Sequence, residues 1–194
     1  MQSPTRLPDL LPVLAGIGSV LYPFLVYFGL PHLPPALLVA LAVGIGGLHL
    51  LRRRGPGRGR AVMSPWSVVA IACVLVALLA LRPVLAVQAY PPLVSLSLAA
   101  TFAWSLAHPP TAIERIARLR RPNLPAEAVV YTGNVTKVWT VFFLANAAIS
   151  SVCALWFSVA IWTLWTGLIS YLLVGVMIIG EVMVRRWVLQ RAAT

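Results

Sequence analysis

His108 and Glu114 are the two residues of this 194-residue sequence best placed to form a general acid–base pair. Such a pair could transfer protons on a lipid-linked or carrier-linked acyl substrate. The same residues also have structural explanations. Glu114 follows Thr111 by three positions, which is the spacing of a helix capping box, and a histidine at a helix end is an ordinary interfacial residue. The pattern leaves an enzymatic role open but favours structural roles for both.

The remaining reactive side chains give little further indication of chemistry. Asp9, His49 and Glu181 are expected near the same membrane face as His108, and Glu181 stands one helical turn before Arg185, as in an ordinary helix ion pair. Cys73 and Cys153 lie within apolar runs and lack the spacing of metal ligands. We therefore expect no catalytic residue, no metal and no cofactor.

The composition predicts an integral membrane protein. Hydrophobic residues make up 60% of the chain and charged residues only 10%, whereas a soluble domain has about 25% charged residues. The net charge of +11 would suggest a nucleic-acid partner in a soluble domain. In a membrane protein, Lys and Arg instead set the orientation of the helices, so no nucleic acid is expected.

Prolines and charged residues divide the apolar sequence into six expected membrane spans. Residues 10–51 contain no charged residue, and one helix of that length would measure about 63 Å, twice the roughly 30 Å of a hydrocarbon core. The chain must therefore turn back at the prolines of 31–35. The same reasoning predicts an all-α bundle with spans at about 10–30, 36–51, 65–81, 90–107, 138–157 and 161–180.

Basic residues indicate how these spans are oriented. All of them except Arg82 fall in the two termini and in the loops 52–64 and 108–137, which share one side of a six-span protein. By the positive-inside rule, both termini and these loops are expected in the cytoplasm. No cleavable signal peptide is evident, so we expect the first span to remain in the protein.

Few polar groups lie inside the spans. Asn146 is the strongest of them, and we expect it to hydrogen-bond to Thr101 or Ser97 of the span 90–107 rather than to a substrate. Pro23 interrupts the first span and frees the carbonyl of Ser19, which a neighbouring helix must cover.

Residues 109–137 are expected to form an amphipathic segment on the cytoplasmic membrane surface. The capping box of Thr111 and Glu114 begins a helix with an apolar face at Ile113 and Ile116. A second short helix is expected to begin at Ala126. Anionic lipid headgroups are the expected ligands of the surrounding arginines, which are Arg115, Arg118, Arg120 and Arg121 here and Arg52, Arg53 and Arg54 in the earlier loop.

Several motifs follow one another within about residues 84–187. They are Pro110, Ile113-Glu114-Arg115, Leu124-Pro125, Trp139, Phe142-Phe143 and Asn146. Their order resembles a family of small bacterial inner-membrane proteins that often accompany aryl-polyene or fatty-acid-like biosynthetic clusters. More distantly, it is similar to intracellular septation protein A, which is implicated in envelope synthesis and division. The likeness implies a location in the bacterial inner membrane, and it transfers no catalytic residue.

Three functions are compatible with these features. The one we favour is a non-enzymatic scaffold or accessory factor that binds anionic lipids and other membrane proteins during envelope, lipid or polyene biosynthesis. The first alternative is a carrier or flippase for a lipid-like intermediate, which predicts a polar cavity near Tyr22, Ser97, Thr101 and Asn146. The second is a membrane enzyme that uses His108 and Glu114. The partner and the oligomeric state remain open.

Overall fold

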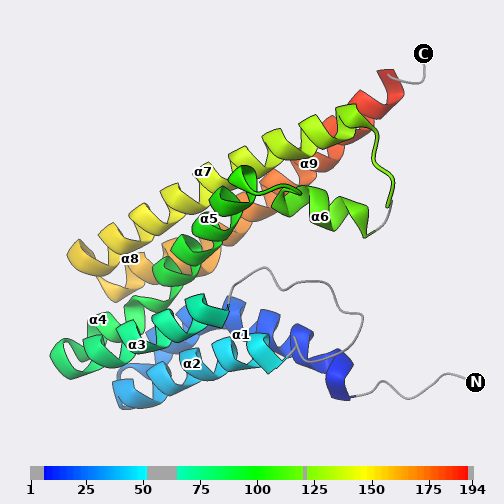
Figure 1. The fold of residues 1–194 in the computed structure, drawn as a ribbon. Coiled ribbons are helices and arrows are strands. Elements are labelled where there is room, and N and C mark those ends of the chain that lie inside the picture. Colours follow the sequence, from blue (N-terminus) through cyan, green and yellow to red (C-terminus); the bar gives the residue numbers. More distant parts are fainter. Residues whose placement is uncertain (1–6, 52–64, 120–121, 192–194) are drawn as a thin grey trace, which may run out of the picture.

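The computed structural model describes residues 7–51, 65–119 and 122–191, and every regular element in these ranges is a helix. The expected all-α class is confirmed. The helices form two groups (Figure 1). The first group contains α1 (Leu7–Gly29), α2 (Pro35–Leu51), α3 (Pro65–Leu81) and α4 (Pro83–Gln88). The second contains α5 (Tyr90–Ala107), α6 (Ala112–Arg118), α7 (Ala126–Trp156), α8 (Val159–Thr163) and α9 (Ser170–Arg191). A π-helical segment, Leu164–Ile169, joins α8 to α9 in one continuous helix.

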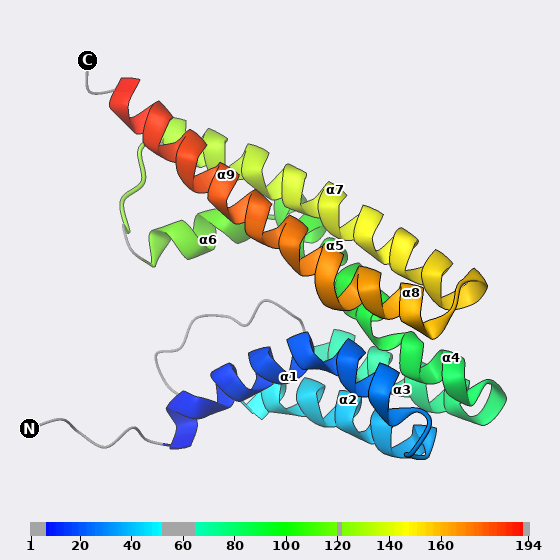
Figure 2. The ribbon, with the colours of Figure 1, turned by 180° about the vertical axis from the view of Figure 1, so that it is seen from behind.

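Successive long helices run in opposite directions, so the molecule has two distinct ends (Figures 1 and 2). The beginning of α1, the end of α5, α6 and the end of α9 lie on the same side of the molecule, where the two groups diverge, and we call this the α6 end. The turn between α1 and α2, the short helix α4 and the turn between α7 and α8 lie at the opposite end, which we call the α4 end.

Most helix bounds agree with those expected from the sequence, because prolines begin or end the helices. Helices α3 and α5 have the bounds expected for the third and fourth spans. Two details differ. Residues 126–137 are not a separate short helix but the first turns of α7, since no proline follows Pro125 to interrupt them. Residues 83–88 form α4, because Pro83 occupies a first helical position, where its missing N–H is tolerated.

Two helices are long and apolar enough to cross a membrane. They are α7 and the continuous helix over Val159–Val184, and only 22% and 11% of their apolar windows are buried. A core helix of a soluble protein would be mostly buried, so these helices present their apolar surfaces outward. Three shorter apolar stretches accompany them, at Ile17–Gly29, Pro35–Leu48 and Pro65–Leu81.

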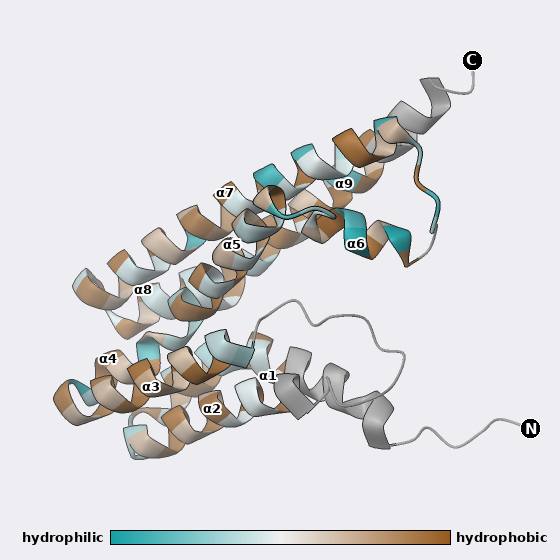
Figure 3. Cartoon of the chain, in the orientation of Figure 1, coloured by the Kyte–Doolittle hydropathy of each residue, from teal (hydrophilic) through white to brown (hydrophobic). Residues whose placement is uncertain are grey.

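The distribution of side chains is the reverse of that in a soluble protein. Large apolar side chains are exposed along the helices, among them Leu25, Phe28, Leu37, Val69, Val76, Val141, Leu155, Leu172, Val176 and Ile179. Hydroxyl side chains are buried between helices, including Ser95, Ser105, Thr132, Thr136, Thr140, Ser150, Thr163, Thr166 and Ser170. The hydrophilic residues gather instead around α6 and the first turns of α7 (Figure 3). Contiguous apolar surface of this extent is typical of contact with lipid.

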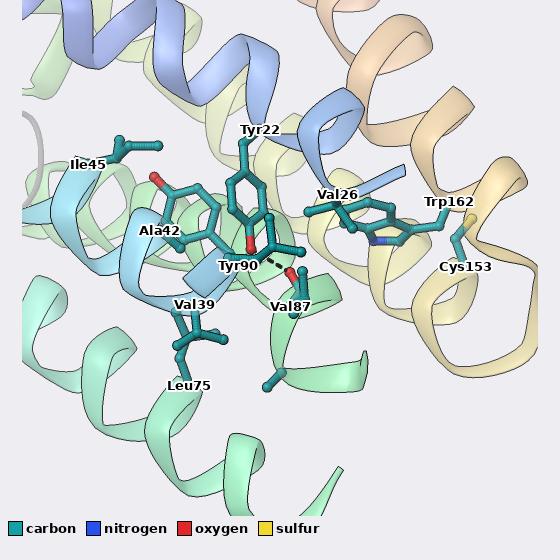
Figure 4. Packing of buried hydrophobic residues seen from close by; sticks show 12 residues of the cluster. Tyr22, Val26, Val39, Ala42, Ile45, Leu75, Val87, Tyr90, Cys153 and Trp162 are labelled. Carbon is teal, nitrogen blue, oxygen red and sulfur yellow. Dashed lines mark hydrogen bonds between the residues drawn. The ribbon is translucent and has the colours of Figure 1, made fainter. Parts of the chain in front are cut away.

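Tyr22 of α1 lies where the two groups of helices meet (Figure 4). Its hydroxyl donates a hydrogen bond of 2.9 Å to the carbonyl of Val87 in α4, and its ring contacts that of Tyr90 edge-on, with centroids 4.8 Å apart. Trp162 of α8 is fully buried in the same cluster. These contacts fix α4 against α1 and hold the two groups together.

The turn of α1 around Pro23 packs against the π-helical segment. The hydroxyl of Tyr171 donates to the carbonyl of Ser19 at 3.0 Å, so the expectation that a neighbouring helix covers this carbonyl is confirmed. Gly167 allows the close approach. A Cβ atom at this position would lie 3.0 Å from Cε2 of Phe24 and 3.3 Å from Cβ of Pro23.

Candidate functional site

The N-terminus of α6 is built as the sequence predicts. The Thr111 side chain accepts a hydrogen bond from the backbone N–H of Glu114 at 3.4 Å, and the Glu114 carboxylate accepts one from the N–H of Thr111 at 3.2 Å. The capping box is therefore confirmed. The carboxylate of Glu114 is directed inward, and the residue is only 3% exposed. Glu114 therefore stabilises the start of α6.

Hydroxyl groups from three different elements accept the first three N–H groups of α6. Ser105 at the end of α5 accepts from Ala112 at 2.9 Å, and Thr136 of α7 accepts from Ile113 at 3.4 Å. Thr111 accepts from Glu114, the third of these donors. The donors that a helix start normally leaves free are therefore all used. As a result, α6 is fixed to both α5 and α7 by polar contacts.

Two arginines of α6 hold the chain on either side of the helix. Arg118 donates from Nε and Nη2 to the Glu114 carboxylate, at 2.8 and 2.7 Å, and from Nη1 to the carbonyl of Pro122 at 3.0 Å. Arg115 donates to the carbonyls of Pro110 and His108 at 2.8 and 3.4 Å. Both guanidinium groups therefore stabilise the local fold. The arginines 52–54, 120 and 121, also expected to bind headgroups, lie outside the described residues.

The structure does not bring His108 and Glu114 together as an acid–base pair. The imidazole of His108 is exposed, stacks on the indole of Trp104 with centroids 3.9 Å apart, and its Nδ1 lies 3.1 Å from the Trp104 carbonyl. Both carboxylate oxygens of Glu114 are occupied by Thr111 and Arg118. No group of three metal-ligating side chains occurs within the part of the chain that was described.

Helix α6 covers only the part Ala112–Arg118 of the amphipathic segment expected over 109–137. Its buried residue is the polar Glu114. Ile116 of the helix and Leu119 at its C-cap are exposed, to 50% and 75%. The hydroxyl acceptors of α5 and α7 hold the capped, polar side of α6 inward. The apolar side chains are consequently left on the surface of the α6 end.

Asn146 forms the polar centre of the second group of helices. Its Nδ2 donates to the hydroxyl of Ser95 in α5 at 2.9 Å. Its Oδ1 accepts from the hydroxyl of Ser170 at 2.6 Å and from the indole N–H of Trp165 at 3.2 Å. One amide of α7 therefore joins this helix to α5, to the π-helical segment and to α9. Asn146 is an interhelical contact, but the expected partners, Ser97 and Thr101, were wrong.

The side chains of Thr101 and Ser97 in α5 do not make the contacts with Asn146 that the sequence suggested. The hydroxyl of Thr101 donates to the Ser97 carbonyl of its own helix at 2.8 Å. The hydroxyl of Ser97 is buried without a hydrogen-bond partner among the described residues. Ser95, which does meet Asn146, was missed because it stands two positions from Ser97, or about 200° around the helix. Only the rotation of α5 against α7 decides between them.

The polar cavity expected of a carrier is not formed by the residues predicted to line it. The hydroxyl of Tyr22 is hydrogen-bonded to the carbonyl of Val87. The amide of Asn146 is hydrogen-bonded to Ser95, Trp165 and Ser170. A small cavity of about 40 Å³ lies elsewhere, between α1, α2, α3 and α5, and is lined mainly by apolar side chains with Ser19 and Tyr90. This volume suits about one water molecule rather than a lipid-like intermediate.

Comparisons with protein-family models, with curated proteins and with solved structures find no match to this chain. The sequence indicated Glu114, but it gave no local signal for Ser105 and Thr136 as acceptors of α6. Their one common feature is a hydroxyl group near the end of an apolar helix.

Proposed function

We propose that the chain is a six-span protein of the bacterial inner membrane, and that it acts as a non-enzymatic scaffold or accessory factor. The two long apolar helices supply two of the spans, and the exposed apolar side chains of α1, α2 and α3 support three more. Helix α5 completes the set, since it lies between α3 and α7 and connects the two groups. Helices of 17 residues, such as α2 and α3, measure about 26 Å and require slight local thinning of the bilayer.

The charge distribution supports the orientation of this topology. Arg115 and Arg118 belong to α6, and Arg185 and Arg186 stand in the last turns of α9, so these basic residues are at the α6 end, whereas Arg82 directly precedes α4. Lys and Arg are enriched on the cytoplasmic side of membrane proteins. We therefore assign the α6 end and both termini to the cytoplasm. The likeness to small inner-membrane proteins, carried by residues such as Glu114, Arg115 and Asn146, supports a role in envelope or polyene biosynthesis.

The observation that carries the scaffold proposal is the complete internal use of Glu114. A general acid or base needs a free atom that can reach a substrate, but both oxygens of this carboxylate stabilise α6. The result is a firmly attached helix that displays Ile116 and Leu119 at the basic end of the molecule. Apolar side chains beside arginines suit a partner at the membrane surface, with anionic lipids as the surrounding medium.

Site-specific photocrosslinking in intact membranes tests this function. A photoreactive residue placed at Ile116 or Leu119 should give a discrete protein adduct. The matched control positions are Leu172 and Val176, which are equally exposed but lie on the apolar surface of α9. These should crosslink lipid. Replacing His108 with Gln should leave the adduct and the biosynthetic output unchanged. Lipid adducts alone at all four positions, or loss of output with His108→Gln, would contradict the proposal.

A further inference from the structure

The α4 end contains an open depression that the scaffold function does not use. Its volume is about 310 Å³, at the lower end of the roughly 300–1,000 Å³ of small-molecule sites. It lies between the region of α4 and the last turns of α7. Its walls are formed by Arg82, Val84, Leu85, Gln88, Ala154 and Leu155. Two of these side chains are polar, and both could bind a ligand.

Arg82 contributes a positive charge that no described residue neutralises. Its side chain is exposed and forms no ion pair or hydrogen bond with any described residue. The four acidic residues of the chain stand in other helices, Asp9 in α1, Glu114 in α6, Glu127 in the first turn of α7 and Glu181 in α9, and the ion pair described in the structure does not involve Arg82. An arginine beside apolar walls, without a counter-ion, favours an anion supplied from outside.

Gln88 gives an independent indication of a ligand. The residue is only 4% exposed, lines the depression and makes no side-chain hydrogen bond within the described ranges. Its amide atoms are not among the fully enclosed unpaired groups of the described residues, so they are reached from the depression and can bond to a molecule that occupies it. The backbone next to it is fixed, since Tyr22 donates to the carbonyl of Val87. Gln88 is thus held in place with its hydrogen-bonding capacity unused.

We propose that this depression binds the phosphate group of an anionic lipid headgroup. The planar guanidinium of Arg82 matches two phosphate oxygens at once, and Gln88 can donate to a third oxygen or to a headgroup hydroxyl. Val84 and Leu155, which are 48% and 52% exposed at the rim, offer apolar surface to the acyl chains. The six-span topology proposed above places this site in the outer leaflet, but binding itself does not depend on that assignment.

Lipid titration of the full-length protein in uncharged detergent, followed by native mass spectrometry, tests the site. The probes are phosphatidylglycerol, zwitterionic phosphatidylcholine and water-soluble glycerol 1-phosphate. One phosphatidylglycerol per chain should remain bound in preference to phosphatidylcholine. Arg82→Gln should weaken this binding by about tenfold or more, because a charge-assisted hydrogen-bond pair is lost, and Gln88→Leu by several-fold. The affinity of Arg82→Lys should lie between that of the unchanged protein and that of Arg82→Gln, since lysine keeps the charge but lacks the planar guanidinium that binds two oxygens at once.

Arg58→Gln is the matched control, because it removes the same charge from the basic loop 52–64. In this variant, one phosphatidylglycerol per chain should remain bound as in the unchanged protein. Equal losses in Arg82→Gln and Arg58→Gln would overturn the proposal in favour of general charge attraction, and unchanged binding in Gln88→Leu would overturn the role of the amide. Displacement by glycerol 1-phosphate at matched concentration would overturn the lipid assignment. None of these outcomes bears on the crosslinks expected at Ile116, so the two proposals fail separately.

Discussion

Replacing Asn146 with Ala should destabilise the helix bundle by about 2 kcal/mol. The amide makes three interhelical hydrogen bonds, to Ser95, Trp165 and Ser170. Hydrogen bonds between membrane helices contribute on average about 0.6 kcal/mol each, so three of them give roughly this total. The free energy of unfolding can be measured by adding SDS to the protein in mixed micelles and following tryptophan fluorescence. The matched control is Asn134→Ala. This amide is exposed and accepts only from Lys137 of its own helix, so the change should stay within about 0.5 kcal/mol.

A double-mutant cycle separates the hydrogen bonds of Asn146 from simple loss of packing. The 2.6 Å contact between Ser170 and Asn146 is the shortest of the three. Asn146→Ala combined with Ser170→Ala should therefore show a coupling energy of about 0.6–1.7 kcal/mol. Thr140 lies on the same helix but donates to the carbonyl of Thr136, so its combination with Asn146→Ala should be additive. Additivity in both cycles would refute the view that Asn146 is the polar centre of the bundle.

Three further substitutions, two of them with a matched control, test the contacts between helices. Gly167→Ala should destabilise the protein by about 1–3 kcal/mol in the same SDS assay, because the new methyl group meets Pro23 and Phe24 of α1. Gly175→Ala, which meets no atom within 4 Å, should instead be neutral or stabilising by up to about 1 kcal/mol. Tyr171→Phe should cost about 0.6 kcal/mol, since it uncovers the carbonyl freed by proline. Glu114→Ala should speed amide hydrogen exchange throughout α6, as followed by mass spectrometry, whereas Glu127→Ala, at an exposed position, should not. An equal effect of the two glycine changes, or slow exchange in the Glu114 variant, would contradict the packing described.

The sequence predicts those features that depend on neighbours along the chain. Prolines begin α2, α3 and α4, and their positions are visible in the sequence. The capping box at Thr111 depends on one side chain and one amide three positions away. The sequence also predicts that a neighbouring helix donates a hydrogen bond to the Ser19 carbonyl, because Pro23 frees this carbonyl and lipid offers no donor for it. The identity of Tyr171 was not predictable, since it is distant in the sequence.

The features that the sequence could not supply depend on how helices rotate against one another. The pairing of Asn146 with Ser95 instead of Ser97 follows from the face that α5 turns toward α7. The inward side of α6 is decided by two hydroxyls, of Ser105 and Thr136, that no local pattern connects to it. The π-helical segment likewise has no local signal, and its Gly167 lies against Pro23 and Phe24, which are distant in the sequence.

The two ends of the molecule use their polar groups in opposite ways, and this difference separates their roles. At the α6 end, Glu114, Arg115 and Arg118 all bind within the chain, so what remains exposed on α6 is mainly apolar surface. Such a surface can contact a partner, and the charged side chains described on α6 are already used within the chain. At the α4 end, Arg82 and Gln88 retain their full hydrogen-bonding capacity beside a depression large enough for a headgroup. We therefore expect a small charged group to bind at the α4 end and a protein partner to bind at the α6 end. A variant that affects one end should leave the measured property of the other unchanged.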